Sequence, residues 1–249
     1  MMGKSVQIIV AFHKAGRHST SDLFLNMHVG KALSEKQLPF PGDDTGDNIS
    51  SLNPYFSELT ASYWAWRNDQ LGDITGLCHY RRYFNVKPSW LESMKGVNKV
   101  KTSKFNFERL TNDASGIDLI LNKYDIILPR KMNLKKSIET FYLEYHAADD
   151  WYAMLNVMDE NYPDYKAQEF FRATSSMHSY NMLICRKEIA EKYFKWLFEI
   201  LFKVHQLVSA QPDAYQKRSI GFLSERLLNL FVHHNGLTVK EFPTFYLDD

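Results

Sequence analysis

The sequence predicts one α/β domain over residues 1–249, with a mostly parallel central sheet that is flanked by helices. Two short, continuous apolar runs, 6–12 and 125–129, are typical of strands that are buried on both faces of a sheet. Stretches with the apolar spacing of amphipathic helices, such as 53–68 and 188–208, lie between such runs. No internal repeat or linker divides the chain, and 249 residues suffice for one large domain.

Composition and charge narrow the class of protein. The net formal charge is +1 and no basic stripe is present, which argues against nucleic acid as a partner. The two cysteines, Cys78 and Cys185, both lie in apolar runs, so we expect buried, reduced thiols rather than a disulfide or a metal site. Reduced thiols suit a cytoplasmic protein.

Membrane-spanning segments are not expected. No stretch of about 18 apolar residues occurs, and the first residues lack the apolar run of a signal peptide. The nearest candidate belongs to the amphipathic helix 188–208, which contains Lys195, Glu199 and Lys203. A buried core helix is the favoured interpretation of this segment, and peripheral contact with the inner face of the plasma membrane is the alternative.

The first strand, 6–12, carries His13 at its carboxyl end. In open α/β sheets ligands bind just beyond the carboxyl ends of strands, so His13 is a candidate contact of a nucleotide. A weak helix is predicted over 23–33.

A loop rich in Pro, Gly and Asp follows over 38–50. Its carboxylates, Asp43, Asp44 and Asp47, either hold a cation through oxygen ligands or form turns in which the Asp side chain accepts from the backbone. Turns are favoured, because the spacing does not match a known calcium loop.

A helix is predicted over 53–68. Asn53 and Pro54 are typical of a cap and a first helical residue, and Phe56, Leu59, Tyr63 and Trp66 then recur at helical spacing. Glu58 lies outside this apolar stripe. It either interacts with the helix dipole or accepts hydrogen bonds from a sugar or ribose.

Residues 76–84 are the centre of the prediction. Gly76 to Cys78 reads as the end of a buried strand, and His79, Tyr80, Arg81 and Arg82 follow it. Adjacent guanidinium groups beside tyrosines form a permanently charged fork that suits phosphate, although a solvated arginine pair is the simpler alternative.

The middle of the chain alternates loop, helix and strand. The lysine-rich segment 87–104 has no clear period and is predicted as a long loop and candidate lid. A short helix over 116–124 and a strand over 125–129 come next, and another helix covers 134–145. His146 and Asp149 interrupt it. Asp149 either caps the next helix or acts as a base that His146 accompanies.

The last third contains a strand over 178–185, which includes Asn181, and the long helix 188–208. A final helix over 218–234 carries Glu225 and Arg226, and a strand over 237–245 closes the domain. The chain lacks a glycine-rich dinucleotide fingerprint, a phosphate loop, a nucleophile elbow and a zinc-binding cluster.

Taken together, several runs resemble a bacterial family of capsular and exopolysaccharide glycosyltransferases that was long described only as a domain of unknown function. The resemblance is carried by Gly76-Leu77-Cys78-His79-Tyr80-Arg81-Arg82-Tyr83-Phe84, by 47–50, 53–60, 63–68, 125–129, 180–182, 196–198 and 221–227, and by His146 with Asp149. It implies a GT-A-like fold, a UDP-sugar donor carrying galactofuranose or galactose, and a lipid-linked oligosaccharide acceptor in capsule, exopolysaccharide or O-antigen synthesis.

One departure from the usual GT-A pattern concerns the metal. Most such enzymes end the corresponding strand with Asp-x-Asp, whose carboxylates hold a divalent cation, whereas this chain has His79-Tyr80-Arg81-Arg82. Fixed positive charge can replace a metal in neutralising a leaving diphosphate, so no cofactor is firmly implied. The alternative is Mn²⁺ or Mg²⁺ held by Asp43, Asp44 or Asp47.

The resemblance and the residues lead to one mechanistic hypothesis. Arg81 and Arg82 stabilise the diphosphate, and Asp149 with His146 deprotonates the acceptor. The expected substrate-binding residues are His13, Asp47, Asn48, Ser50, Glu58, His79, Tyr80, Asn181, Glu225 and Arg226. A non-catalytic sugar-binding or scaffold module in a polysaccharide assembly is the alternative function. Nothing in the sequence indicates an oligomeric state.

Overall fold

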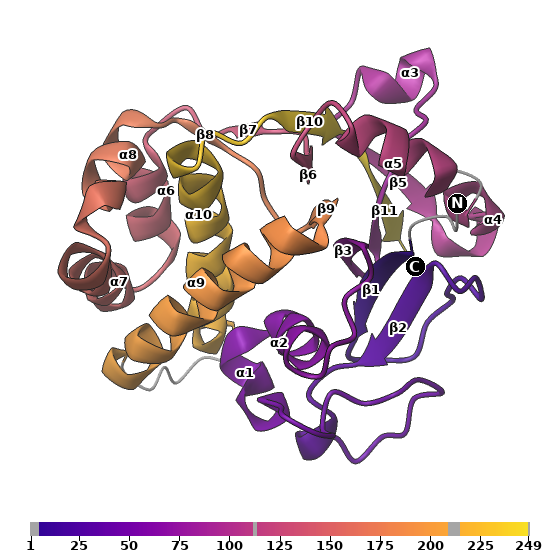
Figure 1. Cartoon of the computed structure of the whole chain (residues 1–249), viewed down its shortest axis with the longest axis horizontal. Coiled ribbons are helices and arrows are strands. Elements are labelled where there is room, and N and C mark those ends of the chain that lie inside the picture. The colour runs from indigo at the N-terminus through magenta and orange to yellow at the C-terminus, as the bar shows by residue number, and fades with distance from the viewer. Residues whose placement is uncertain (1–4, 112–113, 209–214, 249) are drawn as a thin grey trace.

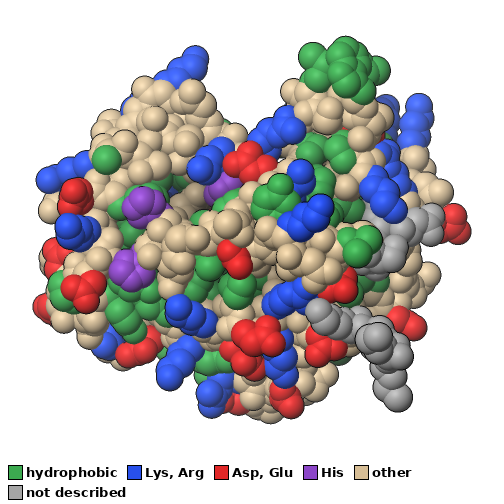
Figure 2. Space-filling view, turned by 45° about the horizontal axis from the view of Figure 1, so that its top comes forward, with side chains coloured by type: hydrophobic (Ala, Val, Ile, Leu, Met, Phe, Trp, Pro, Cys, Tyr) green, Lys and Arg blue, Asp and Glu red, His purple; other side chains and the backbone are tan. Residues whose placement is uncertain are grey.

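The computed structural model describes residues 5–111, 114–208 and 215–248. In this part of the chain, nine strands form one curled sheet, and helices cover both of its faces (Figure 1). The sheet contains the path β10-β6-β9-β3-β4-β11-β5, and β1 pairs with both β2 and β3. Lys, Arg, Asp and Glu side chains are interspersed over the surface in Figure 2, as expected for a net charge of +1.

Three parallel strands form the N-terminal part of the sheet: β1 (Val6–Phe12), β2 (Phe24–His28) and β3 (Ile74–His79). Gly76 fits closely in β3, because a Cβ there would lie 3.0 Å from Ile184 and 3.2 Å from Ile8, closer than most Cβ contacts. Because the strands are parallel, their carboxyl ends meet at one edge.

The sheet is less parallel than the sequence suggested. Strand β9 (Leu183–Arg186) runs antiparallel between β3 and β6 (Ile126–Pro129), and β10 (Val239–Phe242) runs parallel to β6.

Three further strands extend the sheet from a hairpin. Strand β4 (Arg82–Phe84) follows β3 after the two residues Tyr80 and Arg81, and it pairs antiparallel with β11 (Thr244–Asp248). Strand β5 (Val97–Lys101) pairs parallel with β11, so Arg82, Tyr246 and Lys99 lie in register across three strands.

Two apolar layers sandwich the sheet, and alternate residues of β1 supply them. Ile9 and Ala11 face one layer, and Ile8, Val10 and Phe12 face the other. The first layer is built on α1 (Asn53–Phe56), α2 (Leu59–Arg67), α6 (Ile138–Tyr145), α7 (Ala148–Asn161), α8 (Ala167–Ala173), α9 (Lys187–Leu207) and α10 (Ser219–His234). The second layer lies under α4 (Glu108–Thr111) and α5 (Ala114–Leu121).

Helix α9 is a core helix, as favoured by the sequence. Its apolar stripe, from Ala190 to Val204, is buried in the first layer. Among the described residues, no helix has both the length and the apolar character that are needed to cross a membrane.

Several predicted elements are wrong in type or extent. Residues 23–33 contain strand β2 and the 3-10 turn Lys31–Leu33 instead of a helix, because this segment pairs with β1. The predicted helix 53–68 is broken at Ser57, whose φ is 52°. The helix predicted over 134–145 begins only at Ile138, after the two-residue strand β7 (Met132–Asn133), which pairs with β8 (Ser176–Met177).

The prediction of a long loop over 87–104 is also wrong. The segment contains α3 (Trp90–Ser93) and β5. The lid role stays a prediction.

The two cysteines lie on adjacent strands but face opposite layers. Cys78 belongs to the second layer and Cys185 to the first, which leaves both thiols free and buried. Burial raises the pKa of Cys78 to about 12 and also raises the pKa of Cys185.

Candidate active site

A cleft of about 660 Å³ opens where the parallel strands β1, β2 and β3 end. The strand ends contribute one wall, the junction of α1 and α2 a second, and the residues before α10 a third. The described lining residues are Ala11, His13, Val29, Asn53, Pro54, Ser57, Glu58, His79, Tyr80, Arg81, Arg82, Lys217, Arg218 and Tyr246. Arg81, Arg82, Lys217 and Arg218 bring positive charge, and Glu58 is the carboxylate among these residues.

The hairpin between β3 and β4 presents the adjacent arginines. The Tyr80 amide donates to the Ala11 carbonyl (3.1 Å), and the Leu247 amide donates to the Arg81 carbonyl (2.8 Å), which fixes both turn residues. The Arg82 guanidinium lies between two tyrosine rings, 4.6 Å from the ring centre of Tyr180 and 5.1 Å from that of Tyr246. Cation–π contacts of this kind hold an arginine in place without neutralising its charge.

Lys217 and Arg218 form a second pair of adjacent cations in the lining of the same cleft. The Arg218 Nε donates to Ser57 Oγ (2.9 Å), and its terminal nitrogen lies 4.0 Å from Glu58 Oε2. Ser57 can reach Arg218 because the chain turns sharply there between α1 and α2. Helix α10 begins at Ser219, directly after Arg218, so the positive end of its dipole adds to this wall.

Glu58 is a buried carboxylate with a fixed hydrogen-bond partner. The Asn181 amide donates to Glu58 Oε1 (2.7 Å) and to the Gly221 carbonyl (3.1 Å), while Ser224 donates to Asn181 Oδ1 (2.7 Å). Asn181 has a φ of 52°, a left-handed conformation that asparagine tolerates better than most residues. It therefore joins the cleft wall to β9 and α10.

His79 is largely buried beside Glu58, with 14% of its side chain exposed. Its Nε2 lies 2.5 Å from the Tyr180 carbonyl and 3.9 Å from Glu58 Oε1. Burial lowers the pKa of His79, and the neighbouring Glu58 carboxylate partly opposes this shift. A carbonyl can only accept, so Nε2 carries the hydrogen and the lone pair of neutral His79 resides on Nδ1.

Glu225 and Arg226 lie behind the lining residues. Their side chains are 3.5 Å apart, and the Arg226 guanidinium also donates to the Phe222 carbonyl and covers the ring of Tyr142. Burial raises the pKa of Glu225 and lowers that of Arg226. This pair supports the cleft from the side of α10.

The structure brings together six of the expected site residues as lining: His13, Glu58, His79, Tyr80, Arg81 and Arg82. His13 packs against the Tyr80 ring, and burial, followed by the nearby Lys14, lowers its pKa. Histidines with lowered pKa values are mainly neutral near pH 7, so His13 and His79 contribute hydrogen bonds rather than full charges.

Other expected residues lie in the loop before α1, outside the lining. Asp47 binds Arg67 (2.7 Å) and Tyr63 (3.0 Å), and the Arg67 hydrogen bond lowers the pKa of Asp47. Asn48 bonds to the Gly46 carbonyl and Ser50 donates to Asp43. These contacts shape the loop.

The predicted catalytic base, Asp149, and its expected partner, His146, do not line the cleft either. Asp149 is exposed in the first turn of α7, and Ala147 rather than Asp149 occupies the cap position. His146 stacks on Phe222, and its Nδ1 lies 3.4 Å from Gln216. Burial and the nearby Arg226 lower the pKa of His146 to about 4.

The acidic loop does not assemble a cation site from Asp43. Asp43 is fully buried and accepts from the amides of Gly30 (3.0 Å) and Lys31 (3.1 Å) and from Ser50 (2.5 Å). Within 5–111, 114–208 and 215–248, no group of three or more His, Cys, Asp or Glu side chains could hold a metal ion.

Sequence reasoning missed Lys217, Arg218 and Tyr246. The first two are a second pair of adjacent cations, directly before a helix, and this repeat of the Arg81-Arg82 pattern was the available signal. Tyr246 reaches the cleft only through the pairing of β11 with β4, which the sequence does not reveal.

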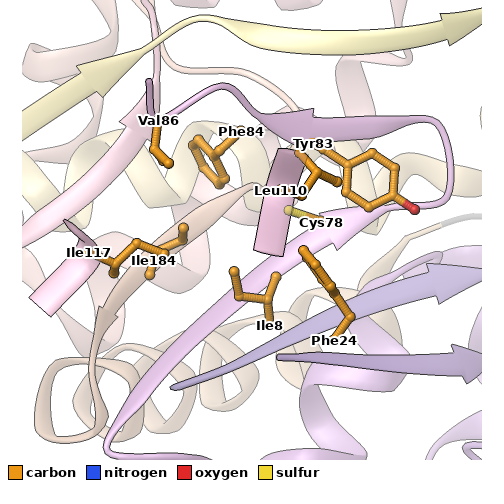
Figure 3. A pocket seen from close by; sticks show the side chains of 9 residues that line it. All are labelled: Ile8, Phe24, Cys78, Tyr83, Phe84, Val86, Leu110, Ile117 and Ile184. Atoms are coloured by element: carbon orange, nitrogen blue, oxygen red, sulfur yellow. The ribbon is translucent and has the colours of Figure 1, made fainter. Parts of the chain in front are cut away.

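A second cavity lies in the core beside Cys78 (Figure 3). It measures about 20 Å³, and side chains such as Ile8, Phe24 and Ile184 line it. That volume is too small for a sugar or a nucleotide, so the cavity is a packing gap.

Comparison with known proteins gives one family and one solved structure. The family model described as "Domain of unknown function (DUF4422)" matches residues 7–236. The structure of the WbbM bifunctional glycosyltransferase in its apo form is similar to this chain, with a TM-score of 0.91 and 33% sequence identity over 98% of the chain. The chain spans 46% of the length of that protein. No curated protein matches the sequence. The fold is therefore the GT-A-like α/β fold that the resemblance implied.

Proposed function

The chain belongs to the DUF4422 family, and from this premise we propose that it is a glycosyltransferase that uses a UDP-sugar. The structural similarity to part of a bifunctional glycosyltransferase supports this activity. We further propose galactofuranose or galactose as the sugar and a lipid-linked oligosaccharide of a bacterial surface polymer as the acceptor. Buried, free thiols fit a reducing cytoplasm as the compartment.

The observation that carries the proposal is the cationic cleft at the carboxyl ends of β1 and β3. Arg81 and Arg82 come from the hairpin between β3 and β4, and Lys217 and Arg218 come from the residues before α10. Several guanidinium groups in one cleft suit a diphosphate, whose oxygens can accept from more than one of them.

The proposed reaction is displacement at the anomeric carbon. The bond between that carbon and the diphosphate oxygen breaks, and its electron pair leaves with UDP. The acceptor oxygen forms the new bond and gives up its proton to a base. Arginines stabilise the charge that develops on the leaving oxygens, as positioned donors do in other group transfers.

We propose His79 as the base in place of Asp149. His79 lines the cleft, and its lowered pKa keeps it neutral near pH 7. Nδ1 accepts the proton of the acceptor hydroxyl, while Nε2 stays bonded to the Tyr180 carbonyl. Glu58, 3.9 Å from Nε2, then stabilises the imidazolium.

Calorimetric titration with UDP, with and without Mn²⁺, tests the diphosphate site. We expect Arg82→Ala to weaken UDP binding about 10- to 100-fold, since a hydrogen bond to a charged group is lost. Arg82→Lys is expected to recover only part of this loss, because it lacks the planar fork. The control is Arg67→Ala, whose side chain is bonded to Asp47 outside the cleft lining.

An absence of UDP binding under both conditions contradicts the proposal and favours the sugar-binding or scaffold module. UDP binding that Arg82→Ala leaves unchanged would place the diphosphate elsewhere.

Transfer assays of His79→Gln and Asp149→Asn test the base. The glutamine amide can still donate to the Tyr180 carbonyl but cannot take a proton. We therefore expect unchanged UDP affinity and a loss of roughly 10²- to 10⁴-fold in kcat. Asp149→Asn should keep wild-type activity. The opposite pattern would return the role to Asp149.

A further inference from the structure

Helix α3 projects apolar side chains into solvent. Trp90, Leu91 and Met94 are 75%, 67% and 66% exposed, which is unusual for three large apolar residues within five positions. Ser89 caps the N-terminus of α3 in a capping box. The Glu92 amide donates to Ser89 Oγ, and the Ser89 amide donates to Glu92 Oε2. The backbone is therefore fixed while the apolar side chains remain uncovered.

Exposed lysines follow these apolar side chains along the chain. Lys95 follows α3, and Val97, Lys99 and Lys101 share the exposed face of β5, where side chains alternate with the buried Asn98. Figure 2 shows a hydrophobic projection at the upper right, above Lys and Arg side chains, at the place of α3 in Figure 1. We call Trp90, Leu91, Met94, Lys95, Val97, Lys99 and Lys101 the α3–β5 face.

The carboxylate within this segment is already neutralised. Both Glu92 oxygens accept from Arg109, at 2.8 Å and 2.6 Å. This hydrogen bonding lowers the pKa of Glu92 to about 2. The α3–β5 face therefore presents lysine charge without an opposing free carboxylate from Glu92.

We propose that the α3–β5 face docks onto an anionic phospholipid bilayer. A projecting tryptophan with two aliphatic neighbours fits the interface between headgroups and acyl chains, where Trp is enriched. Lysines at the base of the projection then meet phosphate and other anionic headgroups, each adding to the attraction. Charge complementarity favours this occupant over a second copy of the chain, which would set lysines against lysines.

The same face is continuous with the cleft. Lys99 is in register with Tyr246 and Arg82, both of which line the cleft, so the three side chains project from one side of the sheet. A lipid-linked acceptor held at the bilayer would then lie on the side of the sheet that carries the reaction. This last step rests on the proposed function, whereas lipid docking itself does not.

Co-sedimentation with vesicles of phosphatidylcholine, with and without phosphatidylglycerol, tests the docking. We expect binding only when phosphatidylglycerol is present. Lys95→Glu/Lys99→Glu/Lys101→Glu should weaken that binding roughly a hundredfold or more, because each lysine near an anionic surface contributes about fivefold. Trp90→Ser/Leu91→Ser/Met94→Ser should also abolish it.

Matched controls carry the same changes elsewhere: Lys166→Glu/Lys192→Glu/Lys195→Glu for charge, and Leu33→Ser/Tyr145→Ser/Leu207→Ser for exposed apolar residues. Both should bind like wild type. UDP titration of the triple serine variant, whose changes lie on α3 and outside the cleft lining, should stay unchanged, which separates this test from that of the proposed function.

Fluorescence gives a second measurement that preserves the apolar surface. Vesicles containing phosphatidylglycerol should shift the tryptophan emission to the blue in wild type, and Trp90→Phe should bind yet lose the shift. Equal binding by the face variants and their controls overturns the inference. A concentration-dependent dimer that the serine variants dissociate also overturns it, because a second copy would then be the occupant.

Discussion

Single residues in the cleft have environments that fit a reactive site better than a structural one. Arg82 is held by two tyrosine rings that leave its charge intact, and His79 keeps one nitrogen bonded and the other with its lone pair. By contrast, Asp47 is engaged by Arg67 and Tyr63, and Asp43 by two backbone amides and a serine. Contacts of this kind separate candidates that sequence reasoning had to treat alike.

The lowered pKa of His146 predicts how the stability of the fold depends on pH. This pKa is about 4 in the folded protein, against about 6.5 in an unfolded chain. The unfolded chain therefore binds the proton first as the pH falls, and stability decreases between pH 6.5 and pH 4. His146→Phe keeps the ring contact with Phe222 but removes the titration.

We expect the free energy of unfolding of His146→Phe to fall less than that of wild type between pH 7 and pH 5. The difference should be about 1 kcal/mol after allowance for partial exposure, measured by urea denaturation. His233→Phe, at an exposed position, serves as the control. Parallel pH curves for His146→Phe and wild type would show that His146 is not protonated differently in the two states.

The side chain of Asn181 connects three separate elements of the fold. It joins the start of α2 through Glu58, α10 through Gly221 and Ser224, and the residues that lead into β9. These segments are distant in the sequence, so one buried amide ties the helical layer to the sheet.

Asn181→Ala should lower the free energy of unfolding by about 2 to 3 kcal/mol, because it leaves the buried Glu58 carboxylate without its donor and places Ala at a positive φ. Asn161→Ala, at an exposed position, should cost much less. Urea denaturation of both variants measures the difference, and equal stability of the two would contradict the role given to Asn181.

Element prediction succeeded where periodicity was strong and failed where tertiary pairing decided. Residues 6–12 form a strand with the predicted bounds, and the long amphipathic helix is α9. Segment 23–33 failed because pairing with β1 overrides its weak helical pattern, and 87–104 failed because β5 is defined by β11.

For the whole molecule, the sequence predicted the fold class and part of the cleft. His13, His79, Arg81 and Arg82 were predictable because they follow the ends of buried strands, where a parallel sheet collects its ligand contacts. Lys217 and Arg218 were missed although they repeat the pattern of adjacent cations, and Tyr246 was not predictable because it reaches the cleft only through the pairing of β11 with β4. Asp149 and His146 lie outside the cleft lining, since Asp149 is exposed in the first turn of α7 and His146, just after α6, stacks on Phe222.

The burial of both cysteines has a practical consequence. Cys78 and Cys185 are each 1% exposed and have raised pKa values, so neither offers a thiolate to a maleimide dye at neutral pH. A single cysteine introduced at an exposed position would therefore be the site at which the maleimide dye reacts. Distances from that single fluorophore to a labelled donor nucleotide or to a lipid dye could then be followed by energy transfer without first removing the native thiols.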